Sequence, residues 1–221
     1  MERWDGLGPA GQLQLPMAQS RRSPERRPAV AEPRPSPTDD CPFCFIAECY
    51  QPFNPRQPPA RADPSIRPTM PEPQPETFIV LSTPLLVAFL DIAPLARGHL
   101  LLCPRKHREK LTAVDASEAK ELGHWLRVLS AALVRSTGVD DWNVVQNNGA
   151  AAAQVVPHAH FHIIPRPELR AQGRWRDQFT MFGRGTRTDL DDDDASELAE
   201  NIRHAIVAIL EEEGEDNKPK L

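Results

Sequence analysis

Hydrophobic residues in the central part of the chain fall into short runs that predict β-strands. Three runs, at 78–82, 85–91 and 99–103, are separated by Thr-Pro and by a loop with Pro and Gly. The first two predict a hairpin. Two further runs, at 142–147 and 158–164, follow a longer amphipathic stretch. Strands of this length with short links favour an antiparallel sheet of about five strands.

A helical period replaces the alternating one in two places. Between Asp115 and Gly138 the apolar residues recur every three or four positions, as on one face of a helix. These residues are Leu122, Trp125, Leu126, Leu129 and Leu133. Asp115 or Ser117 can cap the start of this helix, and Gly138 is typical of its end. A last helix is expected over 196–213, so the fold class is α+β, with a long helix and a C-terminal helix beside the sheet.

The flanking segments lack such patterns and set the expected domain limits. Of the 24 prolines, 17 lie before residue 78. We expect a disordered N-terminal tail at 1–40 and one folded domain over 41–183. A Pro-rich stretch at 51–76 reads as a flexible insertion in that domain. Residues 184–221 are expected to form an acidic loop and the C-terminal helix.

Charge and composition indicate which kinds of binding partner and which cell compartment to expect. The formal net charge of −5 does not indicate a broad nucleic-acid footprint. No apolar stretch is long enough for a membrane-spanning helix, and the N-terminus does not resemble a secretory signal. We therefore expect an intracellular protein, cytoplasmic or nuclear, that binds neither membrane nor nucleic acid. Its four cysteines are then expected to be thiols or metal ligands rather than disulfides.

Three histidines alternate in the last predicted strand, His158-Ala159-His160-Phe161-His162. Because successive side chains of a strand point to opposite faces, the three imidazoles share one face. Imidazole packs less well than Val or Ile, so a role beyond packing is indicated. His-x-His is a chelating spacing, which favours a metal site. An imidazole can also attack phosphorus and form a covalent intermediate, which favours nucleophilic catalysis.

The sequence around these histidines resembles a known family. The run NNGAAAAQVVPHAHFHIIPR, from Asn147 to Arg166, is similar to the signature of the histidine triad (HIT) superfamily, closest to its Hint-like branch of nucleotide-binding hydrolases. A second similarity lies upstream, in the runs FLDIAP, GH and PRKH between Phe89 and His107. The resemblance covers about 41–49 and 78–166 and implies a HIT-like sheet.

The resemblance implies roles for two of the histidines. His160 matches the nucleophile that takes up a nucleoside monophosphate, and His162 matches the residue that binds the phosphate and steadies the transition state. The implied reaction has two steps: His160 displaces the leaving group from the α-phosphorus, and water then hydrolyses the nucleotidyl-histidine. A purine nucleotide or a nucleotide conjugate is the expected partner.

Other residues match the parts of the family's site that hold the nucleotide. The implied set is Asn147, Ala153, Gln154 and Val155 for the phosphate, Asp91 for the ribose hydroxyls, and Phe89 and Ile92 for the base. Asp91 could also be a turn residue at a strand end. Two positions depart from the pattern. Ala153 stands where the family usually has Gly, and a methyl group there disfavours a positive φ. Val155 stands where well-studied Hint members carry a hydroxyl that assists the leaving group.

A structural zinc site is the expected cofactor site. Cys41 and Cys44 have chelating spacing in a short apolar segment. The resemblance implies His99 and His158 as the other two ligands, and four protein ligands leave no open position for water. Family members without zinc keep both histidines, so a metal-free segment is the alternative.

The implied function is hydrolysis of nucleoside phosphoramidates or related nucleotide conjugates. The alternatives are a dinucleoside polyphosphate hydrolase and a nucleotide-binding scaffold with vestigial activity, which the departures at Ala153 and Val155 keep open. A homodimer is expected through the long helix and an edge strand. The face around Trp125 could serve that contact, although an intramolecular core explains it equally well.

Overall fold

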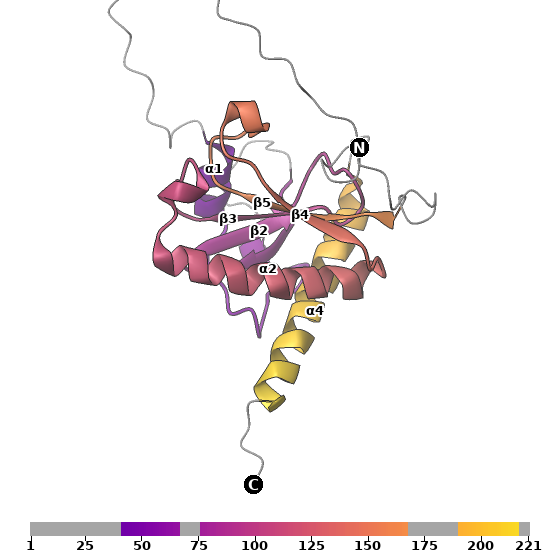
Figure 1. Ribbon diagram of the computed structural model, residues 1–221. Helices are drawn as coiled ribbons and strands as arrows, with labels where there is room; N and C mark the ends of the chain where they lie inside the picture. Colours follow the sequence, from indigo (N-terminus) through magenta and orange to yellow (C-terminus); the bar gives the residue numbers. More distant parts are fainter. Residues whose placement is uncertain (1–40, 67–75, 168–189, 217–221) are drawn as a thin grey trace, which may run out of the picture. The chain divides into compact units, whose positions relative to one another are not determined.

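The structure, a computed structural model, describes residues 41–66, 76–167 and 190–216. Its centre is a five-stranded antiparallel sheet with the order β1-β2-β3-β5-β4 (Figure 1). The strands are β1 (Ile79–Ser82), β2 (Leu86–Leu90), β3 (Leu100–Pro104), β4 (Trp142–Gln146) and β5 (Phe161–Pro165). The sheet and its helices confirm the expected α+β class. The predicted tail at 1–40 and the domain limit at residue 183 lie outside the described residues.

Side chains of the central strands alternate between two buried clusters, one on each face of the sheet. In β2, Leu86, Ala88 and Leu90 belong to one cluster, whereas Val87 and Phe89 belong to the other. Strand β3 alternates in the same way. Both faces of these strands are therefore covered, which explains why their sequence is continuously apolar rather than alternating with polar residues.

Helices α2 (Ala116–Thr137) and α4 (Asp192–Asp216) cover one face. Asp115 caps α2 in a capping box with Glu118, and Gly138 ends the helix in a left-handed conformation with φ of 69°. The apolar face of α2 packs against α4 and the sheet, and Trp125 is only 6% exposed. This helix face therefore serves the core of its own chain. Of the helices in the described ranges, none combines the length and apolar character needed to span a bilayer.

The predicted flexible insertion is in part a packed segment. Residues 51–66 run alongside α4: Arg56 donates to the carbonyl oxygen of Leu210 at 2.8 Å, and Arg61 pairs with Asp193 at 3.2 Å. The acidic run also differs from the expected loop, because α4 begins at Asp192 and its carboxylates occupy the first turn. Negative charge is favourable there because of the helix dipole.

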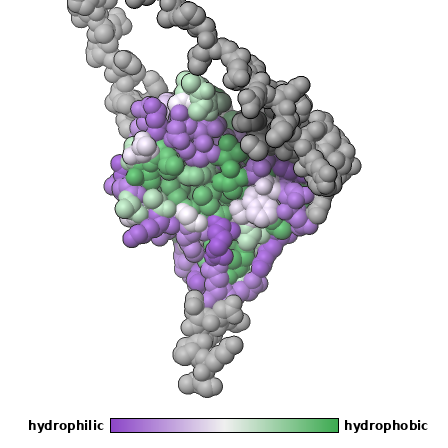
Figure 2. All heavy atoms as spheres, viewed as in Figure 1, coloured by the Kyte–Doolittle hydropathy of each residue, from purple (hydrophilic) through white to green (hydrophobic). Residues whose placement is uncertain are grey.

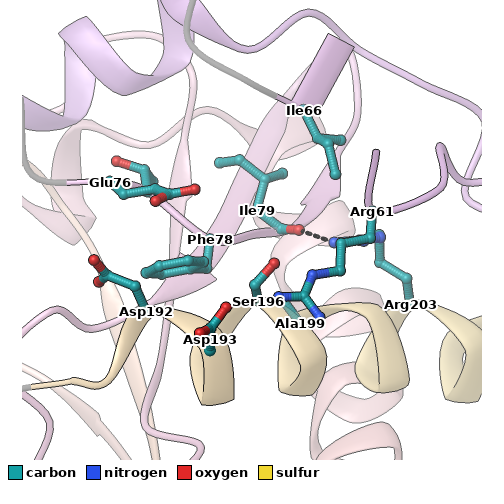
Figure 3. Close-up of a pocket in the computed structure, with 11 residues that line it drawn as sticks. Arg61, Ile66, Glu76, Phe78, Ile79, Asp192, Asp193, Ser196, Ala199 and Arg203 are labelled. Carbon is teal, nitrogen blue, oxygen red and sulfur yellow. Dashed lines mark hydrogen bonds and ion pairs between the residues drawn. The ribbon is translucent and has the colours of Figure 1, made fainter. Parts of the chain in front are cut away.

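Helix α4 is also tied to the edge strand β1. A small cavity of about 180 Å³ lies where the two elements meet (Figure 3). In its wall the buried side chain of Arg203 donates from Nη1 to the carbonyl oxygen of Ile79 at 2.7 Å. This bond satisfies a carbonyl of the edge strand and anchors the middle of α4 to the sheet.

Gly98, directly before β3, fixes the position of His99. Its φ is +89°, and a Cβ there would lie 2.9 Å from Cδ1 of Leu133. We expect Gly98→Ala to lower the free energy of unfolding by about 3 kcal/mol, because backbone strain and overpacking add. Urea unfolding followed by tryptophan fluorescence measures this. Gly123→Ala is the control, since its Cβ would meet nothing within 4 Å. The free energy of unfolding of Gly123→Ala should rise by about 0.5–1 kcal/mol. A lower free energy of unfolding in both variants, or in neither, would contradict the strain and overpacking assigned to Gly98.

Candidate active site

The face of the sheet opposite α2 carries a large cavity. Its volume is about 940 Å³, at the upper end of the range for small-molecule sites of about 300–1,000 Å³. Most of the residues predicted to bind a nucleotide line it, namely Phe89, Asp91, Ile92, Asn147, Ala153 and Val155, together with His160 and His162. The structure thus brings together residues from β2, from the loops that follow β2 and β4, and from the start of β5.

His160 is oriented by the backbone. Its Nδ1 lies 2.6 Å from the carbonyl oxygen of His158. A carbonyl only accepts, so Nδ1 carries the ring proton and Nε2 keeps its lone pair. Burial lowers the pKa of His160, although the bond to His158 opposes the shift. The ring is therefore neutral at neutral pH and has one basic nitrogen.

His162 and His99 form a hydrogen-bonded pair backed by a carboxylate. Nε2 of His99 lies 2.9 Å from Nδ1 of His162. The backbone amide of Leu95 donates to Nδ1 of His99 at 3.2 Å, so Nε2 of His99 is the donor to His162. This leaves Nε2 of His162 as the nitrogen that carries a proton. Oδ2 of Asp91 lies 3.4 Å from Nδ1 of His99, so a carboxylate stands beside the pair.

Asp91 makes a turn contact and also lines the cavity, so its position is compatible with both roles that the sequence suggested. Oδ1 accepts from the amide of Ala93 at 2.9 Å, which is the turn contact. The same side chain lines the cavity and faces His99.

The loop between β4 and β5 borders the other side of the cavity. Gly149 has φ of +91°, the 3-10 helix η3 (Ala150–Ala152) follows, and Ala153 adopts the left-handed conformation with φ of 62°. Gln154 was predicted to contact the nucleotide, but both ends of its amide hold the loop. Oε1 accepts from Gly149 N at 2.6 Å and Nε2 donates to the Glu109 carbonyl at 2.7 Å. Its side chain therefore shapes the loop and is not among the residues that line the cavity.

Ala153 carries backbone strain where the sequence comparison placed a glycine. It is the one non-glycine residue with positive φ in the described part of the chain. The left-handed conformation costs an L-residue with a Cβ about 1–2 kcal/mol. Ala153→Gly should therefore raise the free energy of unfolding by about 1 kcal/mol, measured by urea denaturation. Its neighbour Ala152, inside η3, is the control: Ala152→Gly should lower it by about 0.5–1 kcal/mol. Equal effects at the two positions would refute the strain at Ala153.

A second cluster lies beside the cavity and corrects the predicted ligand set. It contains Cys41, Cys44, His107 and His158, whose ligand atoms all lie within 4.8 Å of one another. His99, predicted as the fourth ligand, is not part of it. The reason is the register of β3 against β5: Leu101 pairs with His162, so the start of β3 faces His162 and its end faces His158. His99 precedes β3, whereas His107 follows it.

The geometry of this cluster fits a tetrahedral metal. Cys41 Sγ lies 3.3 Å and Cys44 Sγ 3.6 Å from Nδ1 of His158, and Cys44 Sγ lies 3.3 Å from Nδ1 of His107. Sulfur and nitrogen ligands of one zinc ion are separated by about 3.6 Å, given its usual bond lengths. Burial, then the neighbouring Cys41, raises the pKa of Cys44 to about 12, so a cation is needed to hold the Cys44 thiol as a thiolate.

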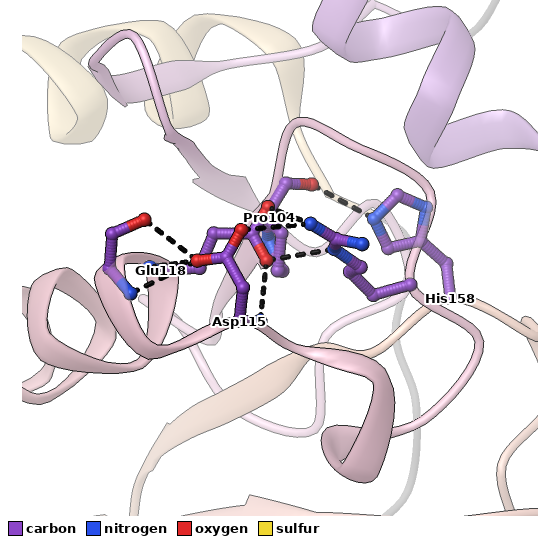
Figure 4. Close-up of polar contacts among 6 residues, drawn as sticks. Pro104, Asp115, Glu118 and His158 are labelled. Atoms are coloured by element: carbon purple, nitrogen blue, oxygen red, sulfur yellow. Dashed lines mark hydrogen bonds and ion pairs between the residues drawn. The ribbon is translucent and has the colours of Figure 1, made fainter.

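The surroundings orient the two histidines of the cluster. Nε2 of His158 lies 2.9 Å from the Pro104 carbonyl (Figure 4), so Nε2 donates and Nδ1 is the lone-pair nitrogen that lies 3.3 Å from Cys41 Sγ. Burial lowers the pKa of His158 to about 4, which keeps the ring neutral. The loop that carries His107 is held by Arg108, which binds the buried carboxylate of Glu118 at 2.8 Å.

Helix α1 (Pro42–Cys49) supplies functional residues that the sequence did not reveal. Its side chains Phe43, Phe45 and Ile46 line the cavity opposite Phe89. Only their apolar character, in a region otherwise rich in proline, signalled that the segment docks on the core.

Three histidines at alternate positions, which lead into one strand of a small antiparallel α+β sheet, are typical of the histidine triad class of domains. A family profile described as HIT domain matches residues 72–169. An uncharacterised HIT-like protein of Methanocaldococcus jannaschii is 37% identical over 109 residues, which cover 48% of this chain and 78% of that protein. The chain belongs to the HIT family.

Relatives with named activities are similar over a shorter share of their length. An adenylylsulfatase of Arabidopsis thaliana is 35% identical over 130 residues, 58% of this chain and 62% of that protein. An adenosine 5'-monophosphoramidase of Schizosaccharomyces pombe is 40% identical over 85 residues, 38% of this chain and 61% of that protein. The chain thus spans about six-tenths of the length of these two relatives.

Solved structures share the fold. The crystal structure of a hypothetical histidine triad nucleotide-binding protein from Sulfolobus tokodaii superposes with a TM-score of 0.52 at 26% identity. The match covers 65% of this chain and 91% of that protein. The chain therefore has the HIT fold and Hint-like relatives.

Proposed function

We propose that the protein is a nucleotide hydrolase that cleaves nucleoside phosphoramidates or related nucleotide conjugates through a nucleotidyl-histidine intermediate. The orientation of His160 carries the proposal: its Nδ1 donates to the His158 carbonyl, so its basic nitrogen is Nε2 in a residue that lines the cavity. A neutral imidazole fixed in this way is a ready nucleophile for phosphorus. The named activities of the relatives support the same chemistry.

The proposed first step forms a bond between Nε2 of His160 and the α-phosphorus, and the bond from phosphorus to the leaving group breaks. The imidazolium form of His162 is proposed to pass its Nε2 proton to the leaving amine, which leaves His162 as a neutral ring hydrogen-bonded to His99. In the second step water attacks phosphorus and gives a proton to the neutral His162, the bond between phosphorus and Nε2 of His160 breaks, and the nucleoside monophosphate leaves. The loop residues Ala153 and Val155 line the cavity and are proposed to border the charged phosphate oxygens in both steps.

The remaining cavity residues are assigned to the rest of the nucleotide. Asp91 lines the cavity near His99 and is the proposed acceptor for the ribose hydroxyls. Phe89 and Ile92 are proposed to contact the base, and Phe43 of α1 faces Phe89 with ring centroids 5.5 Å apart. An apolar slot of this kind binds a planar base by burial and ring contacts.

Zinc held by Cys41, Cys44, His107 and His158 is the proposed cofactor, with a structural role. A bound zinc ion would supply positive charge that keeps the two thiols ionised and would link α1 to β5 and to the loop after β3. All four donors come from the protein, so the reaction steps above are assigned to the histidines of the cavity.

A substrate panel tests the proposed reaction against its alternatives. We expect turnover of adenosine 5'-phosphoramidate with release of AMP, and slower turnover of a diadenosine polyphosphate. Faster cleavage of the polyphosphate would favour the dinucleoside polyphosphate hydrolase. Binding of AMP with no turnover of any panel member would overturn the hydrolase in favour of a binding protein.

Because position 155 is a valine, the leaving group has no proton donor there in addition to His162. Its side chain is 91% exposed and lines the cavity, but it has no hydroxyl. We expect Val155→Ser to raise kcat for an amine leaving group by about tenfold, because a positioned donor lowers the barrier to its departure. Steady-state kinetics on the phosphoramidate measure this. Val207→Ser, on α4 and outside the cavity, should leave kcat unchanged. An equal response of both variants would contradict the assignment.

The expected homodimer is proposed to use the edge strand β4. The apolar face of α2 is covered within the chain, whereas Trp142 and Val144 of β4 are 40% and 46% exposed. Apolar surface lies on this side of the molecule, above α2 (Figure 2). An unpaired strand edge with apolar side chains is well suited to pair with a second copy. Light scattering at two concentrations should give the mass of a dimer for the wild type and of a monomer for Val144→Lys. Wild-type monomer at both concentrations would remove this proposal.

A further inference from the structure

Helix α1 belongs to the metal cluster and to the cavity at the same time. Cys41 and Cys44 turn toward His107 and His158, whereas Phe43, Phe45 and Ile46 form part of the cavity wall. Cys41 lies in both sets. An isolated helix of fewer than about 12 residues is marginal in water, so the position of α1 depends on the groups that hold it.

The two ends of α1 are held by different contacts. At the C-terminal end Arg105 donates to the carbonyls of Ala47 and Tyr50, and the Tyr50 hydroxyl donates to the Thr77 carbonyl at 3.1 Å. These bonds do not involve the cysteines. At the N-terminal end the cap residue is Cys41, which makes no side-chain capping bond, and its sulfur is 3.3 Å from His158. Metal removal is therefore expected to loosen the first turn of α1 while the rest stays docked.

Phe43 connects this first turn to the catalytic residues. Its ring centroid lies 5.8 Å from that of His158 and 5.1 Å from that of His160, in edge-on contacts. The same ring meets Phe89 of the proposed base slot at 5.5 Å. One buried side chain therefore touches a proposed metal ligand, the proposed nucleophile and the wall against which the base packs.

We propose that the metal ion and the bound nucleotide stabilise each other through Phe43, which acts as a positioning residue. This inference rests on the proposed function. The metal fixes the first turn of α1 and with it the Phe43 ring, so the base slot and the His160 ring are preorganised. A nucleotide that packs against the Phe43 side of the cavity in turn holds Cys41 and Cys44 in the geometry that the metal requires. Such coupling is reciprocal: each ligand changes the affinity for the other by the same factor.

Two titrations on the full chain measure the coupling. Calorimetry gives the Kd for AMP with zinc-loaded protein and with protein stripped by a chelator, and we expect about tenfold weaker binding to the stripped protein. Competition with a chromogenic chelator gives the Kd for zinc with and without saturating AMP. The Kd for zinc should fall by the same factor when AMP is present.

Two matched variants separate coupling from general stability. Phe43→Leu keeps an apolar side chain but removes the ring edge, and we expect it to bind zinc as the wild type does while the coupling factor falls toward one. Phe53→Leu, a phenylalanine packed against the same buried cluster but not lining the cavity, should keep the full factor. If Phe43→Leu fails to fold, the two wild-type titrations still show whether zinc and AMP binding are coupled.

The outcomes distinguish this inference from the function on which it rests. Binding of both zinc and AMP with mutually independent Kd values overturns the coupling and leaves the proposed function standing. A protein that binds zinc but no AMP, or AMP but no zinc, overturns the corresponding part of the proposed function and the coupling with it. Equal coupling factors in Phe43→Leu and wild type overturn the role of Phe43.

Discussion

Replacement of His160 by alanine should lower kcat for adenosine 5'-phosphoramidate by about 10⁴-fold or more. The expected loss is this large because the substitution removes the nitrogen that forms the covalent bond, and both chemical steps pass through that bond. Binding of AMP should change little, since the base slot and the loop remain. The measurement is steady-state turnover together with a calorimetric Kd for AMP.

His204→Ala is the matched control for this substitution. His204 is an exposed histidine on α4, the helix that covers the face of the sheet opposite the cavity. It should retain wild-type kcat. Equal and small losses in the two variants would show that the cavity histidine does not carry the reaction.

Cys44→Ser should abolish stoichiometric zinc binding and lower the free energy of unfolding of the zinc-loaded protein by about 3 kcal/mol, or about 10 °C in Tm. Serine is a poor zinc ligand, and the loss of one of four donors removes much of the binding energy that stabilises the folded state. Metal content after gel filtration and thermal unfolding measure the two effects.

Cys49→Ser provides the comparison on the same helix. Cys49 is buried as Cys44 is, but it lies outside the cluster. It should keep one zinc per chain and show only the smaller loss that follows from burying a hydroxyl. If Cys44→Ser kept its zinc, or if the two variants lost equal amounts, the assigned ligand set would be wrong.

The sheet and the long helix could be predicted because their signals are local. Apolar runs broken by Pro and Gly located the strands to within about three residues. Asp115 and Gly138 set the ends of α2 through a capping box and a left-handed end, both of which depend on a few adjacent residues. The histidine segment differed only at its start, where the Ala159 amide bonds to the Arg108 carbonyl and β5 begins at Phe161.

The parts that the sequence did not predict depend on contacts between distant segments. Both His99 and His107 flank the same strand, and the register of β3 against β5 decides which of them lies beside His158 and the cysteines. Residues 51–66 have few large apolar side chains, and their placement depends on Arg56 and Arg61 reaching α4. The role of Gln154 was misjudged for the same reason, since its partner Glu109 lies 45 positions away in sequence.

In the proposed reaction His160 bonds covalently to the α-phosphorus of a nucleotide. Rapid mixing of enzyme with excess adenosine 5'-phosphoramidate, a quench at high pH and mass spectrometry of the digested protein test it most directly. We expect an AMP adduct on the peptide that contains His160, formed before steady state and absent from His160→Ala. Turnover by the wild type with no adduct at any time, or with the adduct on another residue, would contradict it.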